Sequence, residues 1–204
     1  MSKSYFFFIT CLEAGGAQRA MLQLIQYINK VESDANIHII NLSHEGEELE
    51  EPISSYCTSL SNLNLKKISL SKIYSLIKLI RRNQQKSILI GWMYHAGVLA
   101  WICSLFAQKI PIAFSVHHSG LDSKNLSIRT LFIAYFMGLI SLSKRVKKIF
   151  FCAESSLNAH INARYPRKKS SVIFNGVDNV KHGLALKKNK NHIFKIVMAA
   201  NLSL

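Results

Sequence analysis

Proline, glycine and acidic side chains are scarce in this sequence. Its 204 residues include 3 Pro and 9 Gly, and only 18% of them are charged. So few prolines and glycines exclude a collagen-like repeat or a flexible linker protein, and a hydrophobic content of 49% excludes a disordered tail. A chain of this length is enough for one sizeable α/β domain and needs neither a disulfide nor a metal to form its core.

The acidic residues are scarcest in the second half of the chain. Residues 101–204 carry 16 basic and 3 acidic groups, a net charge of +13, whereas residues 1–100 carry a net charge of +2. A cationic half attracts phosphate groups, whether on a nucleic acid, an anionic lipid or a phosphorylated small molecule. No basic stripe interleaved with stacking aromatics is visible, so a nucleic-acid-binding module is the remote alternative.

The four cysteines stand far apart in the sequence, at positions 11, 57, 103 and 152. No CxxC pair and no Cys/His pair at zinc spacing occurs. This pattern predicts reduced, mostly buried thiols in a cytoplasmic protein, and no metal site.

The longer apolar runs do not suit a membrane span. Tyr5–Leu12 is short and aromatic, which favours a buried first strand over a signal peptide. Ile88–Ala107 is interrupted by His95 and two glycines, and Leu131–Leu142 is too short for a hydrocarbon core of about 30 Å. The basic run Lys144–Lys148 beside Leu131–Leu142 leaves contact with an anionic membrane surface open.

Short apolar runs alternate with amphipathic segments along the chain. The predicted strands are Tyr5–Thr10, Ile37–Leu42, Leu65–Leu70, Ser87–Gly91, Pro111–His117, Ile149–Cys152 and Ser171–Phe174. The predicted helices cover 17–28, Ser71–Arg82, Ala96–Ala107, Ser127–Leu142 and Glu154–Ala163. This alternation predicts an α/β fold of repeated βαβ units with a mostly parallel sheet, in which ligands bind beyond the carboxyl ends of the strands.

A glycine turn connects the first predicted strand to the first helix. Gly15 and Gly16 let a ligand approach the backbone closely, and the following helix N-terminus offers free N–H groups to an anion. The pattern is not GxGxxG, so the dinucleotide-binding fingerprint is lacking. By itself the segment is either a structural turn or an anion site.

Aromatic and imidazole side chains follow two later strands. Trp92, Tyr94 and His95 suit stacking on a sugar ring and recognition of hydroxyl groups, and the alternative is ordinary packing at a sheet edge. His117 and His118 follow the next strand, where a histidine polarises a hydroxyl, binds a phosphate or simply bonds to the backbone. Because both clusters end successive strands, we expect them to face the same crevice.

Five segments taken together resemble the N-terminal half of bacterial glycosyltransferase family 4 enzymes. Their order and spacing fit from about residue 5 to the end of the chain, and Lys195–Leu202 resembles the first strand of that family's second domain. The segments are Gly15-Gly16-Ala17-Gln18-Arg19, Trp92-Met93-Tyr94-His95-Ala96, His118-Ser119-Gly120-Leu121-Asp122, Phe151-Cys152-Ala153-Glu154-Ser155 and Asn175-Gly176-Val177-Asp178.

The resemblance implies one half of a GT-B fold, in which two Rossmann-like domains with helices on both sheet faces meet at a cleft. Residues 1–180 would form the acceptor-side domain, and residues 181–204 a linker and the first strand of a second domain. The implied reaction is retaining transfer of a hexose or N-acetylhexosamine from a UDP- or GDP-sugar to a glycan or lipid-linked acceptor. It needs no metal or other cofactor, and serves surface polysaccharide synthesis (lipopolysaccharide, capsule or exopolysaccharide) in the cytoplasm or on the inner face of the cytoplasmic membrane.

The same resemblance assigns roles to individual residues. His118 would be catalytic, although His117 stands where relatives often carry Arg, so which of the two faces the cleft stays open. The largest departure is that most of the second domain is absent, so the alternative is a non-catalytic truncated fragment or an acceptor-binding subunit completed by a second chain. The substrate-binding set would be Gly15, Gly16, Ala17, Arg19, Trp92, Tyr94, His95, His117, Ser119, Asp122, Glu154, Asn175 and Gly176.

Overall fold

The computed structural model describes residues 2–43, 48–64, 70–83, 86–107, 110–121 and 126–176. Its strands are β1 (Ser4–Ile9), β2 (Asn36–Asn41), β3 (Ser59–Asn62), β4 (Ser87–Trp92), β5 (Ile112–Val116), β6 (Val146–Phe151) and β7 (Ser170–Val172). Its helices are α1 (Gly16–Val31), α2 (Glu50–Ser54), α3 (Leu70–Arg82), α4 (Tyr94–Leu105), α5 (Ile128–Ile140), α6 (Glu154–Asn162) and the 3₁₀ turn η2 (Arg167–Lys169).

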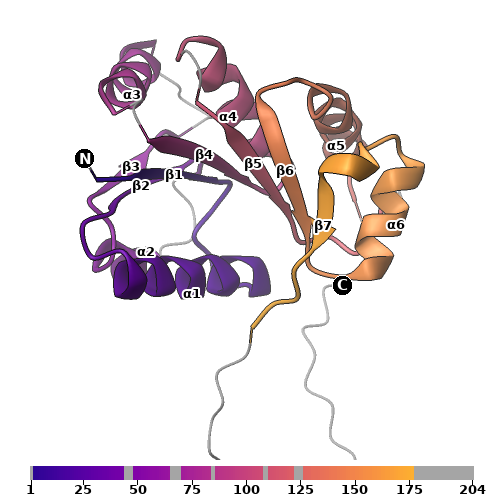
Figure 1. The fold of residues 1–204 in the computed structure, drawn as a ribbon, viewed down its shortest axis with the longest axis horizontal. Coiled ribbons are helices and arrows are strands. Elements are labelled where there is room, and N and C mark those ends of the chain that lie inside the picture. Colours follow the sequence, from indigo (N-terminus) through magenta and orange to yellow (C-terminus); the bar gives the residue numbers. More distant parts are fainter. Residues whose placement is uncertain are drawn as a thin grey trace, which may run out of the picture.

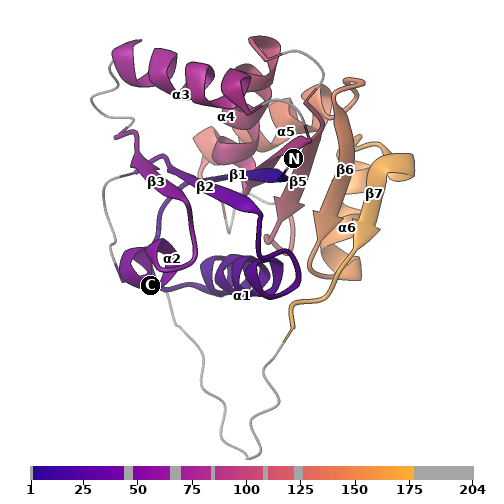
Figure 2. The ribbon, with the colours of Figure 1, turned by 60° about the vertical axis from the view of Figure 1, so that its left-hand side comes forward.

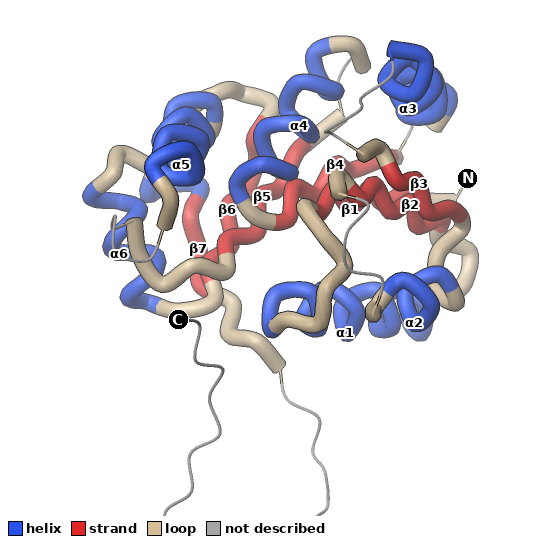
Figure 3. Tube along the Cα trace, turned by 180° about the vertical axis from the view of Figure 1, so that it is seen from behind, coloured by secondary structure: helices blue, strands red, loops and turns tan. Residues whose placement is uncertain are grey.

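The strands form one parallel sheet in the order β3-β2-β1-β4-β5-β6-β7 (Figure 1). Helices α1 and α2 lie on one face, and α3, α4 and α5 lie on the other (Figures 2 and 3). The predicted α/β fold, a Rossmann-like parallel sheet with helices on both faces, is therefore confirmed. Among the described helices, none is both long and apolar enough to cross a membrane.

The core is divided by the sheet into two apolar layers. Side chains of a strand point alternately to opposite faces, so Phe6 and Phe8 enter the layer beneath α3, α4 and α5. Phe7 and Ile9 enter the layer beneath α1, where Met21 is also buried. Because helices cover both faces of β1, the strand is a continuous apolar run rather than an alternating one.

Strand β4 and helix α4 touch through two glycines. A β-carbon on Gly91 would lie 2.4 Å from the Cα of Gly97, and one on Gly97 would lie 2.6 Å from the sulfur of Met137 on α5. Neither position has room for a side chain. The pair therefore sets how closely α4 and α5 pack against the centre of the sheet.

The structure differs from the sequence predictions at three points. The third strand is Ser59–Asn62 rather than Leu65–Leu70: residues 65–69 lie outside the described ones, and Leu70 already opens α3. This edge strand (SLSN) is only half-buried and lacks an apolar signal. The short helix α2 was not predicted. Of the four thiols, Cys103 alone is buried and the others are half-buried. The first strand of a second domain, expected at Lys195–Leu202, and the domain boundary at residue 180 lie outside the described residues.

Candidate functional site

Strands β1 and β4 are the neighbours at which the strand order reverses direction. In such sheets, ligands bind outside the carboxyl ends of the strands at this switch point. The glycine turn follows β1, the segment from Trp92 to His95 ends β4, and the His117–His118 pair follows the adjacent β5. The fold thus brings these three predicted segments to neighbouring strand ends at the carboxyl edge of the sheet.

The glycine turn presents an uncapped helix N-terminus. Gly15 is the N-cap in extended conformation, and α1 has neither a side-chain cap nor an acidic side chain in its first turn. The backbone N–H of Ala14 donates to Glu48 Oε2 at 3.2 Å. A β-carbon on Gly16 would meet no atom within 4 Å. The first-turn N–H groups are therefore available to an anion.

The open space at Gly16 allows a test of ligand approach. We expect Gly16→Ala to keep or slightly raise the free energy of unfolding, because alanine favours helix by about 1 kcal/mol over glycine and meets no neighbour. If a phosphate rests on this turn, the same methyl group displaces it and raises the Kd for a nucleotide sugar or phosphorylated ligand about tenfold. Chemical denaturation and calorimetric titration measure the two effects. An unchanged Kd would remove Gly16 from the binding site.

Trp92, at the end of β4, contacts both the segment that follows β1 and the segment that follows β5. Its indole Nε1 donates to the carbonyl oxygen of Ala17 at 2.9 Å, and its ring stacks on His117 with centroids 4.7 Å apart. The Nε2 of His117 is hydrogen-bonded to Ser115 Oγ at 2.9 Å, and its buried Nδ1 has no partner among the described residues. Burial, with the nearby His118, lowers the pKa of His117 to about 4, so its ring is neutral at pH 7.

A second group of contacts surrounds His118. Its ring stacks on Tyr94 with centroids 5.5 Å apart and 6° between the planes. The hydroxyl of Tyr94 is 2.8 Å from His160 Nε2, and His160 Nδ1 donates to the carbonyl oxygen of Ser156 at 2.7 Å. The hydroxyl of Ser156 donates to the backbone carbonyl of His118. We call these four residues the His118 ring of contacts, because each touches the next and the last returns to the first.

The His118 ring of contacts fixes protonation as well as position. Since His160 Nδ1 bonds to a carbonyl, it carries the proton, and Nε2 accepts from Tyr94. Burial lowers the pKa of both His160 and His118, which keeps both rings neutral at pH 7. The two ring nitrogens of His118 bond to no side chain or backbone group in the described part of the chain. The geometry therefore favours His118 over His117 as the histidine that meets a ligand.

Ser156 and His160 were not predicted as site residues. They lie one helical turn apart on α6, and both are buried. Two polar side chains at this spacing on the inner face of a predicted helix were the available signal. Buried polar groups need partners, so such a pair indicates a packed hydrogen-bond network.

The expected sugar-stacking role of Trp92 and Tyr94 does not match their burial. Trp92 is 4% exposed and Tyr94 is 1% exposed. Each ring packs against one of the two histidines, and a sugar cannot reach a ring face that the core covers. The aromatic pair supports the site from beneath instead of contacting a ligand directly.

Met93, between the two aromatic residues, has a backbone conformation that normally requires glycine. Its φ is 72° and its ψ is 176°, a region that costs other residues about 1–3 kcal/mol. Hydrogen bonds hold it on both sides: its N–H donates to Ser115 O and its carbonyl accepts from the N–H of Gly97. This junction turns Trp92 into the layer beneath α1 and Tyr94 into the opposite layer.

The remaining predicted residues that the structure describes do not join the two histidine clusters. The half-buried His95 has a lowered pKa through burial. Asp122 lies outside the described residues. No group of three or more histidine, cysteine, aspartate or glutamate side chains in the described part could hold a metal ion. The exposed members are Arg19, Ser119, Glu154, Asn175 and Gly176.

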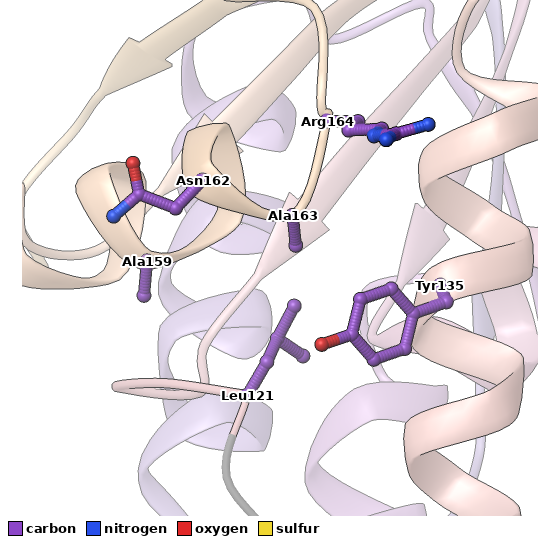
Figure 4. A pocket seen from close by; sticks show the side chains of 6 residues that line it. All are labelled: Leu121, Tyr135, Ala159, Asn162, Ala163 and Arg164. Atoms are coloured by element: carbon purple, nitrogen blue, oxygen red, sulfur yellow. The ribbon is translucent and has the colours of Figure 1, made fainter.

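A cavity of about 540 Å³ lies between α5 and α6, next to the segment that follows His118 (Figure 4). The hydroxyl of Tyr135 points toward Leu121, and Asn162 and Arg164 are the other polar residues that line the cavity. It lies away from the β1–β4 switch point. The cavity was not predicted from the sequence, because its lining residues are spread from Leu121 to Arg164 and form no motif.

The buried histidines make stability depend on pH. Unfolded histidine titrates near pH 6.5, whereas burial lowers the folded pKa of His38, His95, His117, His118 and His160. As the pH falls below about 6.5, the unfolded chain binds protons first, so the free energy of unfolding decreases until about pH 4, where His117 also charges. We expect a loss on the order of 2 kcal/mol from His117 alone.

Urea unfolding near neutral and near pH 4.5 measures this loss. A His117→Gln variant is the control, since it removes one titrating group from the same position and should show a shallower pH dependence. Equal dependence in the two proteins would mean that His117 does not titrate below its ordinary range.

The chain matches one protein family and several solved structures. The profile of Glycosyltransferase Family 4 matches residues 14–180. The crystal structure of Anabaena Alr3699/HepE in complex with UDP-glucose matches with a TM-score of 0.65 and 14% identity, over 86% of this chain and 44% of that one. The S. aureus MnaA–UDP structure matches with a TM-score of 0.57 and 15% identity, over 90% and 50% respectively.

Identities this low show the fold alone. A putative UDP-N-acetylglucosamine 2-epimerase from Listeria monocytogenes shares the fold at a TM-score of 0.55 and 10% identity, over 83% of this chain and 45% of that one. The present chain therefore spans half or less of the length of these solved structures. A search of curated proteins gives no match.

Proposed function

Because the chain belongs to glycosyltransferase family 4, we propose that it supplies the acceptor side of a sugar-transfer site. The observation that carries this proposal is the His118 ring of contacts, which holds a neutral imidazole at the carboxyl edge of β5 with both ring nitrogens unbonded within the described residues. Such a group accepts a hydrogen bond from the hydroxyl of an incoming acceptor and orients it.

The donor in this proposal is a nucleotide sugar. The HepE structures contain UDP-glucose, or UDP, and the MnaA structure contains UDP, which supports a UDP-sugar while leaving GDP-sugars to be tested. The uncapped N-terminus of α1 suits a phosphate of the donor or of a phosphorylated acceptor. The proposed reaction is retaining transfer of a hexose or N-acetylhexosamine, with no metal or further cofactor. In this proposal a separate donor-side domain supplies the remaining groups.

The acceptor is proposed to be a glycan or a lipid-linked sugar used in surface polysaccharide synthesis. We propose that the reaction takes place in the cytoplasm or on the inner face of the cytoplasmic membrane. Residues 1–180 are proposed to form the acceptor-side domain and 181–204 to lead into a donor-side domain. The alternative is an acceptor-binding subunit, not catalytic by itself, that a second chain completes.

Labelled-sugar transfer to a bacterial lipid extract tests the proposal. UDP- and GDP-linked hexoses and N-acetylhexosamines are offered to the 204-residue chain alone, and to the chain joined after Leu204 to the donor-side domain of a family 4 relative. We expect transfer by the joined protein and none by the chain alone. Transfer by the chain alone would mean that two copies complete one site. No transfer by either, with acceptor binding also absent, would overturn the proposal.

A further inference from the structure

Exposed apolar side chains gather on the outer side of α5. Ile128 is 82% exposed, Phe132 is 73% exposed and Leu139 is 63% exposed. With Tyr135, Phe136 and Leu142 they recur at helical spacing, so they share one face of the helix. The opposite face of α5 is buried against the sheet, and Arg129 is the one charged residue among Ile128–Ile140. A helix that is apolar all round is normally covered on every side.

The end of α4 extends this surface. Ile102, Leu105 and Phe106 are also exposed, and the ring of Trp101 meets Phe136 edge-on with centroids 6.4 Å apart. The two helices therefore present one continuous apolar surface. We call it the α5 patch, consisting of Ile102, Leu105, Phe106, Ile128, Phe132, Tyr135, Phe136, Leu139 and Leu142.

Basic side chains border the α5 patch at the C-terminal ends of α4 and α5. Lys144, Arg145 and Lys147 line a cavity of about 320 Å³ together with Ile110 and Pro111. The guanidinium of Arg145 donates to the carbonyl oxygens of Ser104 and Ala107, at 2.8 and 3.3 Å, which fixes the cavity against the end of α4. Lys144 and Lys147 are exposed. We call the cavity the basic pocket.

No carboxylate among the described residues forms an ion pair with a side chain of the basic pocket. Between residues 52 and 176, the described part of the chain contains one acidic side chain, Glu154. It opens α6 at the carboxyl edge of the sheet, whereas Lys144 and Lys147 lie at the amino end of β6, at the opposite edge. The charge of the basic pocket is therefore not neutralised within this part of the protein, and an anionic partner would complement it.

We propose that the α5 patch and the basic pocket dock on an anionic lipid bilayer. The apolar side chains enter the boundary between headgroups and acyl chains, and Lys144 and Lys147 bind lipid phosphates. A second copy of the chain fits less well, because a two-fold interface brings the same patch to itself and offers no carboxylate to the lysines. Joined apolar and cationic surfaces are the combination that interfacial membrane binding requires.

The direction of α5 gives this docking a consequence for the proposed transfer. The helix starts at Ile128, near the carboxyl edge where His118 lies, and ends at the opposite edge beside the basic pocket. A chain that lies along α5 thus keeps the His118 edge close to the bilayer. This last step rests on the proposed function, whereas the docking itself does not.

Vesicle flotation tests the docking with the full chain. The probes are vesicles of phosphatidylcholine alone and of phosphatidylcholine mixed with phosphatidylglycerol. We expect binding to the mixed vesicles that weakens as salt is raised, and little binding to phosphatidylcholine alone. Lys144→Ala/Lys147→Ala should weaken binding about 25-fold, at roughly fivefold for each lysine lost. Phe132→Ser/Leu139→Ser should weaken it at least about tenfold.

Variants of exposed residues on α3 serve as matched controls. Arg81→Ala/Arg82→Ala and Tyr74→Ser remove exposed charges and an exposed ring from α3, and should leave binding unchanged. Circular dichroism must show that every variant remains folded. The proposal would be overturned if both double variants bound the mixed vesicles as strongly as the original chain, or if the original chain did not bind them. A dimer that Phe132→Ser/Leu139→Ser dissociates while lipid binding stays the same would also overturn it. None of these outcomes depends on sugar transfer, so docking and transfer can fail separately.

Discussion

Replacing His118 by alanine is expected to lower the turnover of sugar transfer about a hundredfold while the protein stays folded. The His118 ring stacks on Tyr94, and the Ser156 hydroxyl donates to the His118 backbone carbonyl. Under the proposed function, the neutral imidazole accepts a hydrogen bond from the acceptor hydroxyl. Removing a group that takes up a proton or orients the acceptor hydroxyl typically costs about 10²–10⁴-fold. The joined two-domain protein, assayed at saturating donor and acceptor, measures the effect on kcat.

Two variants show whether the effect belongs to chemistry or to folding. His38→Ala removes a buried histidine of β2, hydrogen-bonded to Ser59, and should reduce stability without a comparable loss of kcat. Ser156→Ala keeps the imidazole but frees its backbone, so it should lower kcat less than His118→Ala does and leave the nucleotide-sugar Kd unchanged. An unchanged turnover for His118→Ala would remove this residue from the catalytic assignment.

Replacing Gly91 by alanine is expected to reduce the free energy of unfolding by about 3 kcal/mol. The new β-carbon would lie 2.4 Å from the Cα of Gly97, a backbone atom that cannot rotate aside as a side chain can. Relief requires α4 to move away from β4, which opens the packing of both against α5 and strains the centre of the sheet. Denaturant unfolding with a linear extrapolation measures the change.

Gly16→Ala is the matched control for this prediction, since it adds the same methyl group where no atom lies within 4 Å. A large loss of stability in both variants would point to a general effect of glycine replacement on the backbone. A small loss in Gly91→Ala would show that α4 can shift by several tenths of an ångström without cost, and would contradict the close approach described above.

Much of the fold could be predicted from the sequence because its strongest signals are local. Buried strands such as β1 and β5 are continuous apolar runs, and α3 shows one apolar face at helical spacing, so all three were predicted within a residue or two. Strand β3 gave no such signal, because it is a short edge strand whose serine and asparagine side chains are half-buried. Its place in the sheet is decided by pairing with β2, which is a tertiary interaction.

For the candidate site, the sequence was enough to predict which strands precede its segments. The aromatic and histidine segments after β4 and β5 were expected to face the same crevice, and the sheet order makes these two strands neighbours, with β1 on the other side of β4. What the sequence could not reveal is which side chains are covered. Trp92 and Tyr94 resemble an open stacking surface in sequence, but the conformation of Met93 turns them into opposite layers of the core. The partner of His118 on α6, Ser156, lies 38 residues away in the chain and belongs to no motif.

The strand order also has a consequence for how the protein folds during synthesis. In the described sheet, each strand pairs with its neighbour in sequence except at β1 and β4, which are separated by β2 and β3. Pairing of distant segments is slow, because the intervening chain must lose its freedom first. The hydrogen bond from the Trp92 indole to the Ala17 carbonyl, between residues 75 apart in the chain, also depends on the pairing of β1 with β4. A growing chain therefore cannot bring the glycine turn next to the segment that ends β4 until this long-range pairing has formed. Assembly of the candidate binding edge thus depends on the one strand pair of the described sheet that is not consecutive in sequence.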